Sequence, residues 1–252
     1  MIFVTFPVLI PLGPLSLHPH WVLETLAYAV GFRLYLRDRK HAGDFLSFLD
    51  RAWVVAAAVA GAALGSKLLY WFEDPHQTLA RWNDPIYLLG GKTIVGGLLG
   101  GTIAVEWTKK SLGITRRTGD LFAIPLALGI AIGRIGCFLS GLGDQTYGVV
   151  TNLPWGIDFG DGISRHPTQL YESIFCLALA AALTAIRRQA HPEGFLFRVF
   201  LAAYLGGRVV IDFWKPGVPF AGLTSLQWCA LAECVYYLAG MVANPKEVPA
   251  HG

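Results

Sequence analysis

The chain has 252 residues, of which 54% are hydrophobic and 15% charged, and its formal net charge is +3. This composition, with a mean hydropathy of +0.49, excludes an ordinary water-soluble enzyme and is typical of a membrane protein. The positive charge comes mostly from bases in the loops, so we expect contact with anionic membrane lipids and no nucleic-acid partner.

Apolar segments long enough to cross a hydrocarbon core of about 30 Å recur along the chain. Because backbone polar groups in lipid must pair internally, these segments are expected to be helices. The sequence therefore predicts an all-α, polytopic membrane bundle of about seven transmembrane helices in one integral membrane domain, 1–252. The predicted spans are 20–36, 52–72, 86–107, 120–140, 168–186, 195–214 and 225–243.

Basic residues are concentrated in alternate loops. They lie between the first two spans, between the third and fourth, and after the fifth: Arg37, Arg39, Lys40, Arg51, Lys109, Lys110, Arg116, Arg117, Arg187 and Arg188. The positive-inside rule places these loops in the cytoplasm. We therefore expect the N-terminus outside, the C-terminus inside and the polar run 141–166 facing outward.

The first 20 residues are apolar but lack a basic start and contain Pro7, Pro11 and Pro14. They do not resemble a signal peptide. Two interpretations stay open: an irregular or amphipathic piece at the outer interface, or a disordered leader.

Glycines recur at i, i+4 spacing within several spans, a pattern that lets helices approach closely. The pairs are Gly61 and Gly65, Gly96 and Gly100, Gly97 and Gly101, and Gly129 and Gly133. Lys92 lies in GGKTIVGG (90–97), where glycine exposes the backbone beside a cation. This arrangement suits a phosphate, although Lys92, like Lys67 in the second span, can instead snorkel to the interface.

Arg134 lies within the apolar segment FAIPLALGIAIGRIGCFLSG (122–141). A guanidinium at membrane depth is expensive and rarely faces lipid, so it indicates a buried anion site or a substrate path. In the sixth span, Tyr204, Arg208 and Asp212 are spaced i, i+4, i+8 and project from one helical face. A purely structural pair between Arg208 and Asp212 is the alternative.

The run 141–166 is rich in turn-forming residues and predicts an ordered, reversing segment. Asp158 and Asp161 suit turn chemistry, and Trp155 and Phe159 suit the depth of lipid head groups. His166, Gln169 and Glu172 follow and share one side of the next helix.

The four cysteines lie within predicted spans and show no CxxC or partnering histidine spacing. We therefore predict no disulfide, no metal site and no cofactor. The converging cations, with carboxylates and a histidine nearby, instead indicate binding of an anionic phospholipid head group and acid–base chemistry on it.

Several motifs carry a family resemblance. GRIGCFLSG (133–141), LPWGIDF (153–159), RHPTQLYE (165–172) and YLGGRVVIDFWKP (204–216) resemble successive motifs of the bacterial prolipoprotein diacylglyceryl transferases. The resemblance implies a multi-pass enzyme of the inner membrane with its active site toward the periplasm. Such an enzyme transfers the diacylglyceryl group of phosphatidylglycerol to the lipobox cysteine thiol of a prolipoprotein signal peptide and releases glycerol phosphate.

By this resemblance, Arg134 and Arg208 match the essential arginines of the family. The full set of expected catalytic residues is Arg134, Arg208, His166, Glu24 and Asp144. The expected substrate-binding residues are Lys92, Gly136, Gln169, Glu172, Tyr204, Asp212, Gly96 and Gly97.

The chain also departs from the family pattern. Cys137 and Ser140 stand where asparagines are common, and Val95 replaces a histidine proposed as catalytic. Lys92, Glu24 and Asp144 are candidate substitutes. Two alternatives therefore stay open: a related phospholipid-dependent transferase with another acceptor, and a noncatalytic lipid-binding or transport protein.

Overall fold

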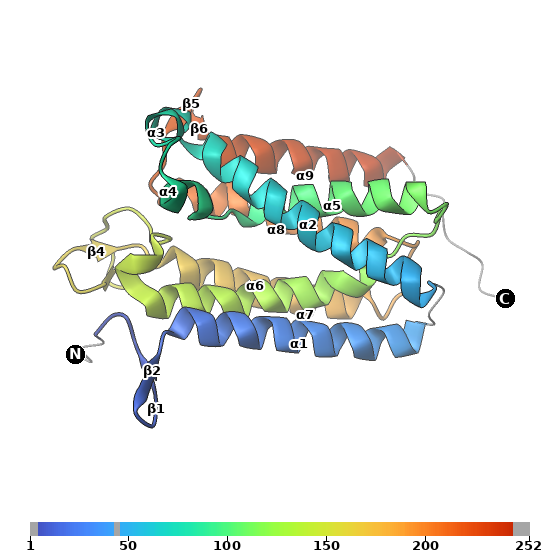
Figure 1. Cartoon of the computed structure of the whole chain (residues 1–252), viewed down its shortest axis with the longest axis horizontal. Coiled ribbons are helices and arrows are strands. Elements are labelled where there is room, and N and C mark those ends of the chain that lie inside the picture. Colours follow the sequence, from blue (N-terminus) through green and yellow to red (C-terminus); the bar gives the residue numbers. More distant parts are fainter. Residues whose placement is uncertain (1–4, 43–45, 244–252) are drawn as a thin grey trace. The chain divides into compact units, whose positions relative to one another are not determined.

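The computed structural model describes residues 5–42 and 46–243 (Figure 1). The predicted placement of the two termini falls on residues outside these ranges. The chain divides into two compact units, which we describe separately. The first contains Met1–Ala42, Thr118–Pro216 and Tyr237–Gly252, and the second contains Gly43–Arg117 and Gly217–Tyr236. The single membrane domain stays a prediction.

Helices dominate the described residues, and each predicted span corresponds to a long helix. These are α1 (Pro19–Ala42), α2 (Phe48–Glu73), α5 (Ile94–Ser111), α6 (Asp120–Ser140), α7 (Thr168–Ile186), α8 (Phe195–Ile211) and α9 (Ser225–Ala243). Among the described helices, α2, α7, and α6 extended to Asp144 meet both the length and the apolarity needed to cross a membrane. The mainly helical prediction is confirmed, whereas seven crossings stay a prediction.

The third predicted span, 86–107, is wrong as a single helix. The chain forms α4 (Pro85–Leu89), then an extended break, and then α5. Gly91 has a φ of +51°, which ends helical geometry, and the Thr93 side chain caps the new helix by accepting from the Gly96 N–H. A further short helix, α3 (Pro75–Ala80), begins after Asp74, whose side chain accepts from the Gln77 N–H.

In the first unit, α6 is central and contacts α1, α7 and α8. The Ser173 hydroxyl of α7 donates to the Ala131 carbonyl of α6 at 2.9 Å. The Asp120 carboxylate, at the start of α6, accepts from the N–H groups of Gly194 and Phe197 at 2.7 and 2.9 Å. These N–H groups belong to the first turn of α8 and have no carbonyl partner within that helix. Asp120 therefore fixes α8 against α6.

In the second unit, α2 and α5 pack through the predicted glycines. A Cβ added to Gly65 would lie 2.8 Å from the Gly100 Cα, and one added to Gly100 would lie 2.9 Å from the Gly65 Cα. Backbones meet here at distances that no larger side chain permits, which confirms close approach for this pair of helices.

Short hairpins lie outside the long helices. At the N-terminus β1 (Ile10–Leu12) pairs antiparallel with β2 (Leu15–Leu17), so this part of the leader is neither helical nor disordered. In the second unit β5 (Pro219–Phe220) pairs with β6 (Leu223–Thr224) before α9.

The predicted ordered loop is confirmed. It contains a 3₁₀ turn, η1 (Gly141–Asp144), and a hairpin of β3 (Ile157–Asp158) and β4 (Ser164–Arg165). Asp158 Oδ1 accepts from the N–H groups of the next turn, those of Gly160, Asp161 and Gly162. Trp155 is exposed, whereas Phe159 is only 2% exposed and packs on Phe6; the depth of both residues relative to the lipid head groups stays a prediction.

Candidate functional site

Polar ends of four helices meet at one end of the first unit. They are the start of α1, the end of α6, the start of α7 and the end of α8 (Figure 1). Because α6 contacts each of the other three helices, residues far apart in the sequence lie close together at this end.

Glu172 of α7 is the centre of a buried ionic cluster and is fully inaccessible to solvent. Its Oε2 pairs with Arg134 Nε of α6 at 2.9 Å and with Arg208 Nη1 of α8. The Tyr204 hydroxyl donates to the other carboxylate oxygen at 2.7 Å. The two arginines therefore converge from separate helices, as predicted, but onto a carboxylate of the protein itself.

Arg208 also binds Asp212, with 2.8 Å between Nη2 and Oδ1, which confirms that the polar stripe of α8 lies on one face. Asp212 opens η2 (Asp212–Trp214), and the chain then reaches Lys215. The Lys215 ammonium lies 3.7 Å from both Glu172 and Asp212. Three cations and two carboxylates leave the cluster with one surplus positive charge.

Lys215 lies just beyond the predicted sixth span. Burial, together with the nearby positive charges of Arg208 and Arg134, lowers the pKa of its ammonium from 10.5 to about 8. Losing its proton near that pH would remove the surplus positive charge.

Gln169 lies three residues before Glu172 and is fully buried. Neither its amide nitrogen nor its amide oxygen has a hydrogen-bond partner among the residues that the structure describes. Buried polar groups are normally paired, so this amide is a candidate contact for a bound molecule.

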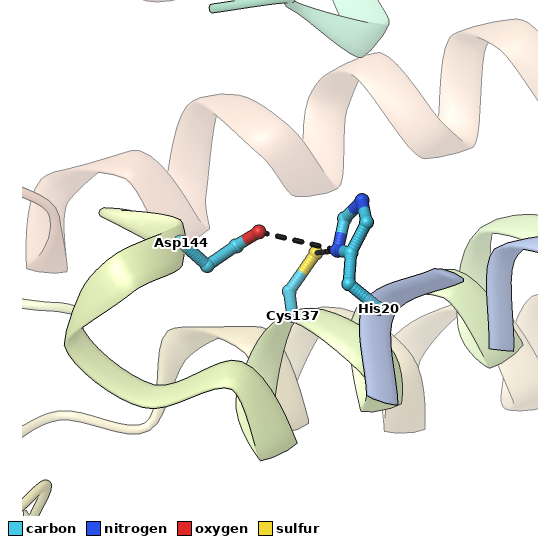
Figure 2. A group of neighbouring side chains, drawn as sticks. All are labelled: His20, Cys137 and Asp144. Carbon is cyan, nitrogen blue, oxygen red and sulfur yellow. Dashed lines mark hydrogen bonds and ion pairs between the residues drawn. The ribbon is translucent and has the colours of Figure 1, made fainter. Parts of the chain in front are cut away.

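A second group of side chains lies beside this ionic cluster. His20 of α1, Cys137 of α6 and Asp144 of η1 place one nitrogen, the sulfur and one oxygen within 4.8 Å of one another (Figure 2). His20 Nδ1 is 3.2 Å from Asp144 Oδ1 and 3.9 Å from Cys137 Sγ. These types of ligand atom suit a metal ion such as Zn²⁺.

Gly136 explains why α1 and α6 come close enough to form this group. A Cβ at Gly136 would lie 3.1 Å from the Leu23 Cβ and 3.4 Å from the His20 Cα. This packing role is visible in the structure, and binding of substrate by Gly136 stays a prediction. Arg134 joins the two groups, because its Nη1 is 3.9 Å from Cys137 Sγ while its Nε binds Glu172.

His166 lies close in sequence to Glu172 but has other neighbours. It is buried, its Nδ1 is 3.1 Å from the Tyr171 hydroxyl, and its ring packs against Trp214. Glu24 lies on α1, where its Oε2 is 3.5 Å from His20 Nε2. The catalytic roles expected for His166 and Glu24 stay predictions.

Lys92, Gly96 and Gly97 belong to the second unit. Gly96 packs against α2 at Gly65 and Leu69, and Lys92 is exposed in the break between α4 and α5. Lys67 of α2 donates to the backbone carbonyls of residues 89, 90 and 91, so it holds this break rather than reaching outward.

Sequence reasoning missed His20 entirely and treated Cys137 only as a departure from a family pattern. A usable signal was present: His20 and Glu24 are spaced i, i+4 at the start of the first predicted span. What the sequence alone does not reveal is the approach of Cys137, 117 residues later in the chain.

The apolar helices define a helical membrane protein, and its interior holds a buried cluster of cations paired with carboxylates. Residues 7–243 match the family described as prolipoprotein diacylglyceryl transferase. The chain belongs to this family.

Individual relatives agree with the family match. The phosphatidylglycerol–prolipoprotein diacylglyceryl transferase of Glaesserella parasuis is 31% identical, and the similarity covers 84% of this chain and 82% of the relative. Proteins of the same name from Cupriavidus necator and Trichormus variabilis are 32% and 33% identical. The similarity covers 98% of this chain and 95% of the Cupriavidus protein, and 82% of this chain and 77% of the Trichormus protein.

Proposed function

We propose that this protein transfers the diacylglyceryl group of phosphatidylglycerol to the lipobox cysteine thiol of prolipoproteins and releases glycerol phosphate. Membership of the family supports this assignment. The departures from the family pattern at Cys137, Ser140 and Val95 leave Arg134 and Arg208, which match the family's arginines, in place.

The observation that carries the proposal is the convergence of Arg134, Arg208 and Lys215 on Glu172. The surplus positive charge of this cluster matches the single negative charge of a phosphodiester. Guanidinium groups bind phosphate oxygens with paired, charge-assisted hydrogen bonds. The same cations stabilise the extra charge that develops when glycerol phosphate leaves.

The reaction is a displacement at the glyceryl carbon that carries the phosphate ester oxygen. The thiolate sulfur of the lipobox cysteine forms a bond to this carbon, and the carbon–oxygen bond breaks with its electron pair going to glycerol phosphate. Arg134 and Arg208 hold the departing phosphate, while Glu172 and Asp212 keep both guanidinium groups in place between turnovers. The unpartnered Gln169 amide offers a neutral donor and acceptor for the glycerol moiety.

The membrane arrangement belongs to the proposal as well. The long helices cross a bacterial inner membrane seven times, with the site toward the periplasm and multiple lipids around the bundle. Within the first unit, basic residues gather in the last turn of α1 and directly after α7, away from the site. There Arg187 Nη1 pairs with Asp38 Oδ2 at 2.5 Å, which supports an outward-facing site under the positive-inside rule.

The test is transfer by purified protein in liposomes that contain phosphatidylglycerol, with a synthetic lipobox peptide as acceptor. Mass spectrometry of the peptide is expected to show one added diacylglyceryl group on cysteine, and none on a peptide with serine in its place. Arg208→Lys is expected to reduce transfer, because lysine cannot form the paired contacts. Arg116→Gln, at an exposed site in the second unit, is the matched control.

Two results would overturn this assignment. Consumption of phosphatidylglycerol without change of the peptide would favour a related transferase with a different acceptor. Tight lipid binding without turnover would favour a noncatalytic lipid-binding or transport protein.

A further inference from the structure

The side chains of His20, Cys137 and Asp144 form a ligand set that the reaction above does not otherwise use. They come from three elements, α1, α6 and η1, and converge on a small common volume (Figure 2). Imidazole nitrogen, thiolate sulfur and carboxylate oxygen are the usual protein ligands of zinc, and separations of 3–4 Å between them suit a tetrahedral ion. The measured distances, 3.2 Å and 3.9 Å from His20 Nδ1, lie in that range.

The surroundings orient these ligands as outer partners of a metal site do. Glu24 Oε2 lies 3.5 Å from His20 Nε2, so it favours a proton on that nitrogen and leaves the lone pair of Nδ1 facing Cys137 and Asp144. The Thr146 hydroxyl donates to Asp144 Oδ2 and leaves Oδ1 for the common volume. A carboxylate behind a ligating histidine is a recurrent feature of zinc sites.

We propose that His20, Cys137 and Asp144 bind one Zn²⁺ ion whose fourth position takes the lipobox cysteine thiol. Catalytic zinc sites provide three protein ligands and leave one position open, whereas structural sites are closed by four. The Cys137 thiolate and the Asp144 carboxylate balance the two charges of the ion. The side chain of His20 is 24% exposed and that of Asp144 13% exposed, so an incoming thiol can reach the ion.

This inference rests on the proposed function. It adds a means of making the acceptor thiol nucleophilic in a chain that has Val95 in place of the histidine proposed as catalytic in the family. A thiol that binds zinc gives up its proton, here to the surrounding water. The zinc-bound sulfur then attacks the glyceryl carbon, the carbon–sulfur bond forms and glycerol phosphate leaves with the electron pair. The neutral thioether is a poor ligand and departs from the ion.

Arg134 places the two halves of this reaction side by side. Its guanidinium lies 3.9 Å from Cys137 Sγ and also binds Glu172, the centre of the cationic cluster. A thiolate held at the ion and a phosphate held by Arg134 and Arg208 are therefore neighbours within one unit of the structure.

Metal content is the first test. Protein purified without chelators is expected to contain about one zinc per chain by elemental analysis. Cys137→Ser and Asp144→Asn are expected to lose the metal, while the matched control Cys229→Ser, on α9 of the second unit, retains it. Glu24→Gln keeps all three ligands and is expected to weaken zinc affinity about 10–100-fold. This variant keeps the inference testable if a ligand variant fails to fold.

Cobalt in place of zinc reports the ligands directly, without any turnover. The Co²⁺ protein is expected to show a sulfur-to-cobalt charge-transfer band that Cys137→Ser abolishes. Adding lipobox peptide is expected to raise this band about twofold as a second sulfur joins the ion. A peptide with serine in place of cysteine is the control and leaves the band unchanged.

The outcomes separate this inference from the proposed function. Transfer by protein that contains no zinc and is insensitive to a chelator would overturn the metal site and leave the transferase intact, with His20 and Asp144 as a proton acceptor. A bound metal whose cobalt band does not respond to the peptide would overturn the open position. Stoichiometric zinc and a responding band in a protein that transfers nothing would uphold thiol binding at the ion and refute the transferase.

Discussion

Replacing Glu172 by glutamine isolates the charge at the centre of the buried cluster. The two side chains have nearly the same shape, and the amide oxygen still accepts the hydrogen bond from the Tyr204 hydroxyl, now 2.7 Å long. What disappears is the negative charge that holds Arg134, Arg208 and Lys215 together. Three cations would then face one another in a nearly dry interior, with only Asp212 to compensate.

The magnitude follows from these contacts. One ion pair at such separations is worth about 4 kcal/mol at the effective dielectric constant of a protein, before the cost of desolvation. Removing one partner of a buried pair while leaving the other charged destabilises proteins by about 3–5 kcal/mol. For a chain of this size, that corresponds to a fall in the melting temperature of roughly 10 °C.

The assay is thermal unfolding in mixed micelles of lipid and detergent, followed by tryptophan fluorescence. Asp161→Asn, which breaks the more exposed pair with Arg165, is the control and is expected to leave the melting temperature unchanged. The double variant Glu172→Gln/Arg134→Gln is expected to regain part of the loss, because Arg134 loses its carboxylate partner in the single variant whereas Arg208 keeps Asp212. An unchanged melting temperature for Glu172→Gln would refute the cluster as a source of stability.

Three more changes probe the two units. Gln169→Met is expected to reduce transfer at least tenfold without lowering stability, because the buried amide has no described protein partner to lose; equal transfer by variant and wild type would argue against substrate contact. Transfer is expected to weaken above pH about 8 through a rising KM for phosphatidylglycerol, as Lys215 loses its proton, and Lys215→Arg should keep KM flat to higher pH. Gly65→Ala is expected to destabilise the protein by about 1–3 kcal/mol in chemical unfolding, since its Cβ would lie 2.8 Å from the Gly100 Cα, whereas Gly240→Ala meets nothing within 4 Å and should be neutral.

The parts of the fold that could be predicted are those set by local physics. Long apolar segments must form helices in lipid, and each of the seven predicted segments overlaps a long helix. The spacing of Tyr204, Arg208 and Asp212 placed them on one face, because helical periodicity fixes side-chain direction. The expense of a buried guanidinium predicted a buried anion site or a substrate path at Arg134, and the structure places the Glu172 carboxylate of the protein there.

The parts that could not be predicted depend on contacts between distant segments. Glu172 as the common partner of both arginines requires knowing that α6, α7 and α8 meet at one end. His20 and Cys137 show no ligand spacing in the sequence, because their approach depends on Gly136 packing against α1. The break at Gly91 was not predicted, because the mean hydropathy is averaged over a window of residues and does not detect a single residue with a positive φ.

The way Lys67 holds the break before α5 bears on how this chain enters its membrane. The ammonium of Lys67 is satisfied by carbonyls of residues that follow it by 22 to 24 positions. During synthesis α2 is complete before those carbonyls exist, and an isolated α2 would carry an uncompensated charge within an apolar segment. Insertion of residues 48–111 as one hairpin avoids that intermediate, so the translocation machinery is expected to release these helices together rather than one at a time.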